Sequence, residues 1–176
     1  MIELVFGAGI IALIFAVILS LYILKKPAGS QKMQEISEII HKGALTFLKK
    51  EYEVLSVYLI VVAVILYAFL DNGWKLAVSF LIGGVSSALA GNIGMRIATK
   101  SNARTAEATK THIGDGLKIA FYSGAVMGLS VVGIGLLGVL CLYYFFGDPN
   151  IIYGFGFGAS SIALFARVGG GIYTKA

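Results

Sequence analysis

The chain has 176 residues, of which 58% are hydrophobic and only 13% are charged, and its formal net charge is +5. Soluble domains carry about a quarter charged residues, so this composition excludes an ordinary soluble domain and indicates an integral membrane protein. The positive charge lies beside apolar runs, without the aromatic and basic modules that bind nucleic acid, which argues against a nucleic-acid partner. Cys141 is the only cysteine, so no disulfide framework is expected within the chain.

Five apolar runs follow one another along the chain. A helix needs about 20 apolar residues to cross the hydrocarbon core of a bilayer. The expected spans cover residues 4–24, 54–70, 76–95, 119–146 and 151–176. The first run is too long for a signal peptide, and Glu3 stands where such a peptide carries positive charge. We therefore predict an all-α fold, a polytopic membrane helix bundle with five transmembrane helices.

Polar segments separate these spans. In residues 31–53, apolar residues recur at helical spacing with Lys and Glu on the other side, which predicts a helical extension that runs into the second span. Residues 100–117 are predicted to form a polar loop with short helical ends. The Asp, Asn, Gly and Pro content of "DNGW" and "GDPN" predicts turns before the third and fifth spans.

The distribution of Lys and Arg predicts the orientation. With five spans, every Lys and Arg except Lys75 falls on one side of the membrane. Short loops rich in Lys and Arg face the cytosol. We therefore expect the N-terminus outside, the extension 31–53 and the loop 100–117 in the cytosol, and residue 176 at the cytosolic side.

Small residues repeat at intervals of four on three of the spans, where they would let helix backbones approach closely in lipid. Glycine is also simply common in membrane helices. The rows are Gly83, Ser87 and Gly91 with Gly84, Ala88 and Asn92 on the third span, Gly124 and Gly128 on the fourth, and Gly154 and Gly158 on the fifth. Three separate rows favour tight bundling.

Most other polar residues fit solvated surface positions. The two histidines lie far from any cluster of Cys or carboxylates at metal-ligand spacing, so we expect surface histidines rather than metal ligands. The acidic pairs fit solvated helix charges better than catalytic pairs. These residues are His41 and His112, and the pairs Glu35 with Glu38 and Glu51 with Glu53.

Arg167 and Lys175 at the end of the fifth span are the most informative charges. An ionisable group within a span is costly and marks a pathway or a partner charge. Eight residues separate the two, about 12 Å along a helix, which places Arg167 roughly two turns deeper than Lys175. On the residues alone, the simpler interpretation is that both anchor the end of the helix at the membrane surface.

Three stretches carry a family resemblance that covers essentially the whole chain. "FARVGGGIYTKA", "GMRIATKSNARTAEA" and "GAVMGLSVVGIGLLG" resemble the fifth span, the stretch after the third span and the fourth span of the membrane-bound, ion-translocating pyrophosphatases. The resemblance implies one part of a bundle of about sixteen spans that works as a homodimer. It further implies hydrolysis of inorganic pyrophosphate in the cytosol and outward transport of H⁺ or Na⁺.

The resemblance also implies roles for residues. Lys175 corresponds to a lysine that contacts pyrophosphate, and Arg167 to the arginine of the charged cluster that links hydrolysis to the ion gate. Mg²⁺ is the expected cofactor, with its ligands beyond Ala176, and a K⁺ requirement is left open. No residue of this chain is expected to ligate a metal or to be catalytic, because no acidic residue follows Asp148.

We therefore expect an N-terminal fragment of the pump, inactive by itself. The alternative is a small, self-contained five-span membrane protein with a structural or regulatory role.

Overall fold

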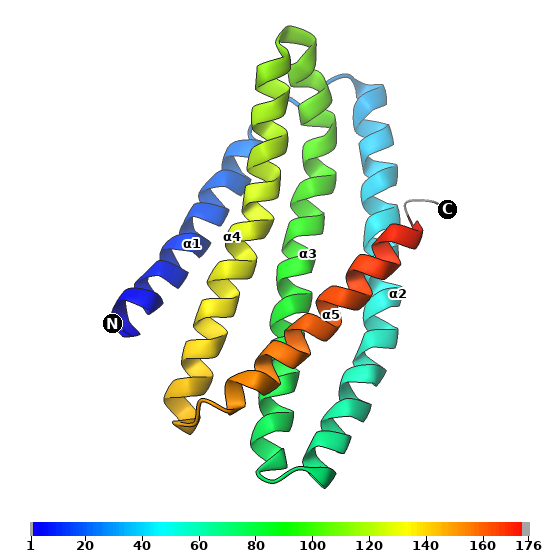
Figure 1. The fold of residues 1–176 in the computed structure, drawn as a ribbon. Coiled ribbons are helices and arrows are strands. Elements are labelled where there is room, and N and C mark those ends of the chain that lie inside the picture. Colours follow the sequence, from blue (N-terminus) through cyan, green and yellow to red (C-terminus); the bar gives the residue numbers. More distant parts are fainter. Residues whose placement is uncertain (1, 174–176) are drawn as a thin grey trace.

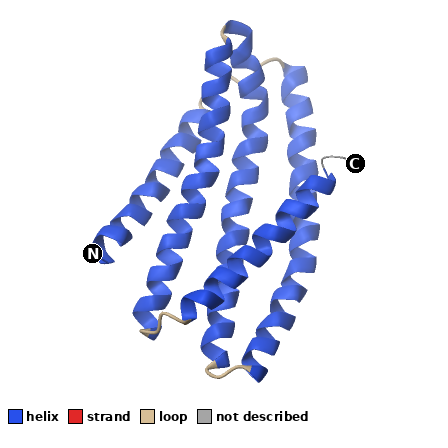
Figure 2. Cartoon of the chain, in the orientation of Figure 1, coloured by secondary structure: helices blue, strands red, loops and turns tan. Residues whose placement is uncertain are grey.

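The computed structural model describes the backbone of residues 2–173 and the side chains of residues 2–168, which fold into five long helices (Figure 2). They are α1 (Ile2–Leu24), α2 (Gln31–Phe69), α3 (Gly73–Thr111), α4 (Ile113–Phe146) and α5 (Ile151–Tyr173). Each is long and apolar enough to cross a membrane. Large apolar side chains such as Leu4 (77% exposed) and Phe121 (73% exposed) cover the outer surface, as lipid contact requires. The predicted all-α bundle with five membrane-length helices is confirmed.

Short breaks with identifiable causes separate the helices. α1 ends shortly before Pro27, which removes a backbone donor. Ser30 caps the start of α2, because its Oγ accepts a hydrogen bond from the backbone N–H of Met33 at 3.4 Å. α4 ends at Gly147, which adopts the left-handed conformation (φ 65°) that glycine takes without strain. One continuous helix, α2, therefore covers the residues of both the extension and the second span.

Residues 100–117 differ from the predicted loop. α3 continues to Thr111, α4 begins at Ile113, and His112 alone separates them. The Ala, Glu, Lys and Arg residues of the segment favour helix, and no glycine or proline interrupts it before Gly114. Ser101 is buried and its Oγ lies 3.0 Å from Ser123 Oγ of α4 in a hydrogen bond. The prediction of a loop was wrong, because the polar side chains of this segment can form hydrogen bonds with the neighbouring helix of a hairpin.

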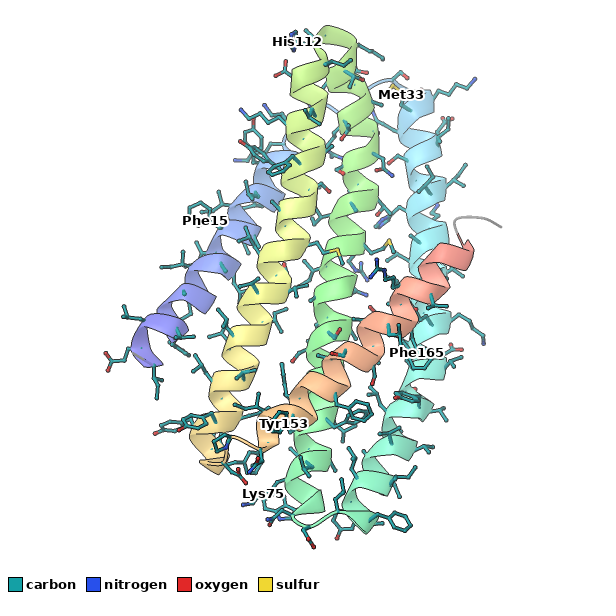
Figure 3. All side chains as sticks on the ribbon, viewed as in Figure 1. Phe15, Met33, Lys75, His112, Tyr153 and Phe165 are labelled. Carbon is teal, nitrogen blue, oxygen red and sulfur yellow. The ribbon has the colours of Figure 1, made fainter. Side chains whose placement is uncertain are left out.

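α3 is the central element, because it contacts all four other helices (Figure 1). α1 packs mainly against α4, whereas α5 crosses α3 obliquely on its way from α4 toward α2. The links at residues 25–30 and His112 lie at one end of the bundle, which we call the basic end. Residues 70–72 and 147–150 form the opposite end. Figure 3 shows Met33 and His112 at the basic end and Lys75 at the opposite end.

Glycines allow the backbones of α3 and α5 to touch. A Cβ atom on Gly83 would collide with the carbonyl oxygen of Phe155, and one on Gly158 with that of Phe80. The predicted rows differ in this respect. For Gly91, Gly124 and Gly128, nothing lies within 4 Å of an added Cβ in the described part of the chain. Of the predicted rows, those that contain Gly83 and Gly158 therefore bring the two backbones together.

The crossing predicts different effects on stability for substitutions at two neighbouring glycines. Gly158→Ala should destabilise the protein by about 2 kcal/mol, because a rigid backbone group fills the space that the methyl group needs. Gly156→Ala is the matched control, since nothing lies within 4 Å of its added Cβ. Thermal unfolding of both variants in detergent checks this. Equal unfolding temperatures for the two variants would contradict the crossing.

Candidate functional site

The course of α5 determines what surrounds Arg167. At the start of α5, the buried Ser79 Oγ of α3 donates a hydrogen bond to the carbonyl oxygen of Ile151 at 2.6 Å. Further along, the hydroxyl of Tyr58 in α2 donates to Ser161 Oγ at 3.3 Å. These bonds tie α5 first to α3 and then to α2. The next turns of α5 carry Arg167 to a cavity that α2 also lines.

This cavity has a volume of about 430 Å³ and is lined by α2, α3, α4 and α5. Its walls are largely apolar and include Met95, Met127 and Ile162. One acidic and one basic side chain line it among the described residues, Glu51 of α2 and Arg167 of α5. The sequence predicted Arg167 as a functional residue, and the structure brings it together with Glu51.

Glu51 is not the solvated surface charge that the sequence predicted. Both of its carboxylate oxygens are buried, and neither has a hydrogen-bond partner among the described residues. Glu53 does fit the prediction: it is exposed, and its carboxylate accepts a hydrogen bond from Lys50 Nζ at 2.8 Å. Side chains two positions apart on a helix point in directions that differ by about 200°. The carboxylates of Glu51 and Glu53 therefore lie on opposite sides of α2. Glu51 shares its side of α2 with Leu48 and Leu55, both buried.

Arg167 has no ion pair or hydrogen bond with another described residue, and much of its side chain is exposed. It does not form an ion pair with Glu51 in this structure. Both side chains line the same cavity, and neither forms an ion pair with a described residue.

The remaining predicted residues lie elsewhere. Lys175 lies outside the described residues. His41 Nδ1 is 2.6 Å from Thr99 Oγ1, and His112 Nδ1 accepts a hydrogen bond from the N–H of Gly114 at 3.0 Å, which caps α4. Among the described residues, no group of three or more His, Cys, Asp or Glu side chains could hold a metal ion.

The burial of Glu51 predicts how charge reversal affects stability. Glu51→Lys should destabilise the protein by about 3 kcal/mol, because it places a second cation beside Arg167 between apolar walls. Glu53→Lys is the matched control on the exposed side of α2, and it should leave the unfolding temperature nearly unchanged. Thermal unfolding in detergent measures both. The assignment fails if Glu53→Lys destabilises the protein as much as Glu51→Lys.

Comparison of the sequence with known proteins places the chain in a family. Residues 10–176 match the family described as "Inorganic H+ pyrophosphatase". A K⁺-insensitive pyrophosphate-energized proton pump from Methanosarcina mazei is 48% identical over 96% of the chain. A putative K⁺-stimulated pyrophosphate-energized sodium pump from Clostridium tetani is 55% identical over 96% of the chain. The chain spans about a quarter of the length of each of these curated relatives, 25% in both. It belongs to the membrane H⁺/Na⁺ pyrophosphatase family.

Proposed function

We propose that the chain forms part of a pyrophosphate-energised ion pump, which hydrolyses inorganic pyrophosphate in the cytosol and moves H⁺ or Na⁺ outward. The observation that carries this proposal is the alignment of 96% of the chain with two pumps at 48% and 55% identity. One of these relatives is named as a proton pump and the other as a putative sodium pump. The proposal therefore covers both ions.

In this pump, Lys175 binds pyrophosphate and Arg167 links hydrolysis to ion movement. A lysine ammonium stabilises the negative charge of the substrate and of the transition state. Arg167 lines an apolar cavity together with Glu51, and we propose Glu51 as a counter-charge for the guanidinium. A charge pair between apolar walls responds strongly to a nearby change of charge, which suits a residue that couples two events.

Mg²⁺ is the proposed cofactor, since a metal neutralises phosphate charge and activates water in phosphoanhydride hydrolysis. We propose that its ligands lie in the part of the relatives that this chain does not cover. Relatives are named both as K⁺-insensitive and as K⁺-stimulated, so K⁺ is proposed only as a possible activator. We also propose that the pump is a homodimer.

The proposal places the basic end of the bundle in the cytosol. Residues 31–53 and 100–117 then belong to the cytosolic side, and the five spans form the N-terminal part of one membrane domain. This orientation follows from the distribution of Lys and Arg, of which Lys75 lies at the opposite end (Figure 3).

Removal of Lys175 and removal of Arg167 from the full-length protein should have different effects. Lys175→Ala should lower the rate of pyrophosphate hydrolysis by about a hundredfold, because transition-state charge loses a partner. Arg167→Ala should lower the number of ions moved per pyrophosphate cleaved. Phosphate release and ion uptake, measured in parallel in sealed vesicles, check both effects.

Two controls sharpen this experiment. Lys75→Ala removes a cation from the opposite end of the bundle and should alter neither quantity. The 176-residue chain by itself should release no phosphate, and Mg²⁺-dependent release from it would contradict that part of the proposal. Normal hydrolysis by Lys175→Ala, or unchanged coupling in Arg167→Ala, would instead return that residue to a role as a helix anchor.

The orientation can be tested with single cysteines in a Cys141→Ala background. Asp71→Cys lies at the opposite end of the bundle and Gln31→Cys at the basic end, and both positions are exposed. Asp71 is preferred to Asn72, whose left-handed backbone (φ 56°) disfavours cysteine. A membrane-impermeant maleimide added outside intact cells should label Asp71→Cys and spare Gln31→Cys. The reverse pattern would invert the proposed orientation.

A further inference from the structure

A second cavity lies at the basic end, where α1 ends beside the hairpin of α3 and α4. It has a volume of about 360 Å³. Three cations from three segments line it: Lys26 directly after α1, Arg104 of α3 and Lys118 of α4. The first cavity, which contains Arg167, shares no lining residue with it.

The cations of this cavity are held together without carboxylate partners. Lys26 Nζ lies 4.6 Å from the ring centroid of Tyr22, and Lys118 Nζ lies 5.8 Å from that of Tyr122. The two tyrosine rings contact each other edge to face, with centroids 5.6 Å apart. Aromatic faces attract ammonium groups but do not neutralise them. Neither lysine forms an ion pair with a described carboxylate.

The third cation, Arg104, is fixed by backbone groups. Its Nη1 donates to the carbonyl oxygen of Lys100 at 2.6 Å, and its Nη2 donates to that of Leu24 at 3.3 Å, in the last turn of α1. Its Nε has no acceptor among the described residues. Arg104 thus joins α1 to α3 while its charge is not balanced by an acid.

Two carboxylates also line the cavity, and they do not cancel this charge. Glu107 Oε2 is already paired with Lys110 Nζ at 2.6 Å. Asp115 lies in the first turn of α4, where the helix dipole favours a negative charge. Asp115 is therefore the one lining carboxylate that is not already in an ion pair, and it faces three cations. The cavity thus has an excess of positive charge.

The position of the cavity indicates which anion fits it. It lies where the apolar run of α1 ends and that of α4 begins, and large apolar side chains are exposed on these turns of the two helices: Leu21 (54%), Leu117 (69%) and Phe121 (73%). Tyrosine and basic side chains are typical of the level of lipid headgroups. Basic pockets between membrane helices bind anionic headgroups. A lipid phosphate would enter the cavity while its acyl chains cover the adjacent apolar surface.

We propose that Lys26, Arg104 and Lys118 bind the phosphate of an anionic phospholipid at the basic end of the bundle. This site is independent of the proposed pump activity, because its ligand and its residues are different. Substitution of the two lysines removes attraction for the phosphate. Arg104 is left unchanged, because it also donates a hydrogen bond to the last turn of α1.

The test uses the full-length protein and phosphatidylglycerol as the probe, with phosphatidylcholine as the neutral lipid. Lipid adducts are counted by native mass spectrometry from detergent, and the unfolding temperature is recorded during lipid titration. The variant Lys26→Gln with Lys118→Gln should weaken phosphatidylglycerol binding by about thirtyfold, from two lysines near the headgroup. Its binding of phosphatidylcholine should not change.

The matched control is Lys32→Gln with Lys49→Gln, which removes the same charge from α2 at residues that do not line this cavity. It should change phosphatidylglycerol binding less than twofold. Equal loss in the two double variants would show a general surface attraction and overturn the site. Competition by millimolar glycerol phosphate or inorganic phosphate would also overturn it, since the cavity would then bind a soluble anion.

Discussion

The backbone contact between α3 and α5 is the constraint on which the course of α5, and with it the surroundings of Arg167, depends. Lipid chains are as apolar as the helix surfaces, so close packing rather than hydrophobic burial holds membrane helices together. Gly83 and Gly158 remove the side chains at the point where α5 crosses α3. With larger residues there, α5 would stand farther from α3 and lose its reach to α2. The shared cavity of Glu51 and Arg167 is a consequence of this crossing.

The sequence predicted the fold well where the physics is local. The number and type of the helices follow from the length and apolar character of five runs, because a bilayer requires both. Residues 100–117 were misjudged because local polarity does not distinguish a loop from a helix whose polar groups meet a neighbouring helix. The contact of Ser101 with Ser123 joins residues 22 positions apart, and no reading of the segment alone contains that information.

The candidate site was predicted only in part. Arg167 was recognisable because a cation after an apolar run is costly. Glu51 was missed because it was judged together with Glu53, its close neighbour in sequence but on the other side of the helix. Its position between Leu48 and Leu55 at helical spacing was a usable signal, since both leucines are buried. The approach of α5, which makes that side of α2 important for Arg167, depends on tertiary packing.

The single-residue joint at His112 has a mechanical consequence. α3 has 39 residues and α4 has 34, which correspond to rods of about 58 Å and 51 Å, whereas the hydrocarbon core is about 30 Å thick. Much of both helices must therefore lie outside the hydrocarbon core as a stiff helical hairpin. Because each helix is continuous, a sideways force on the end of the hairpin at His112 would be transmitted to the membrane-embedded part of both helices.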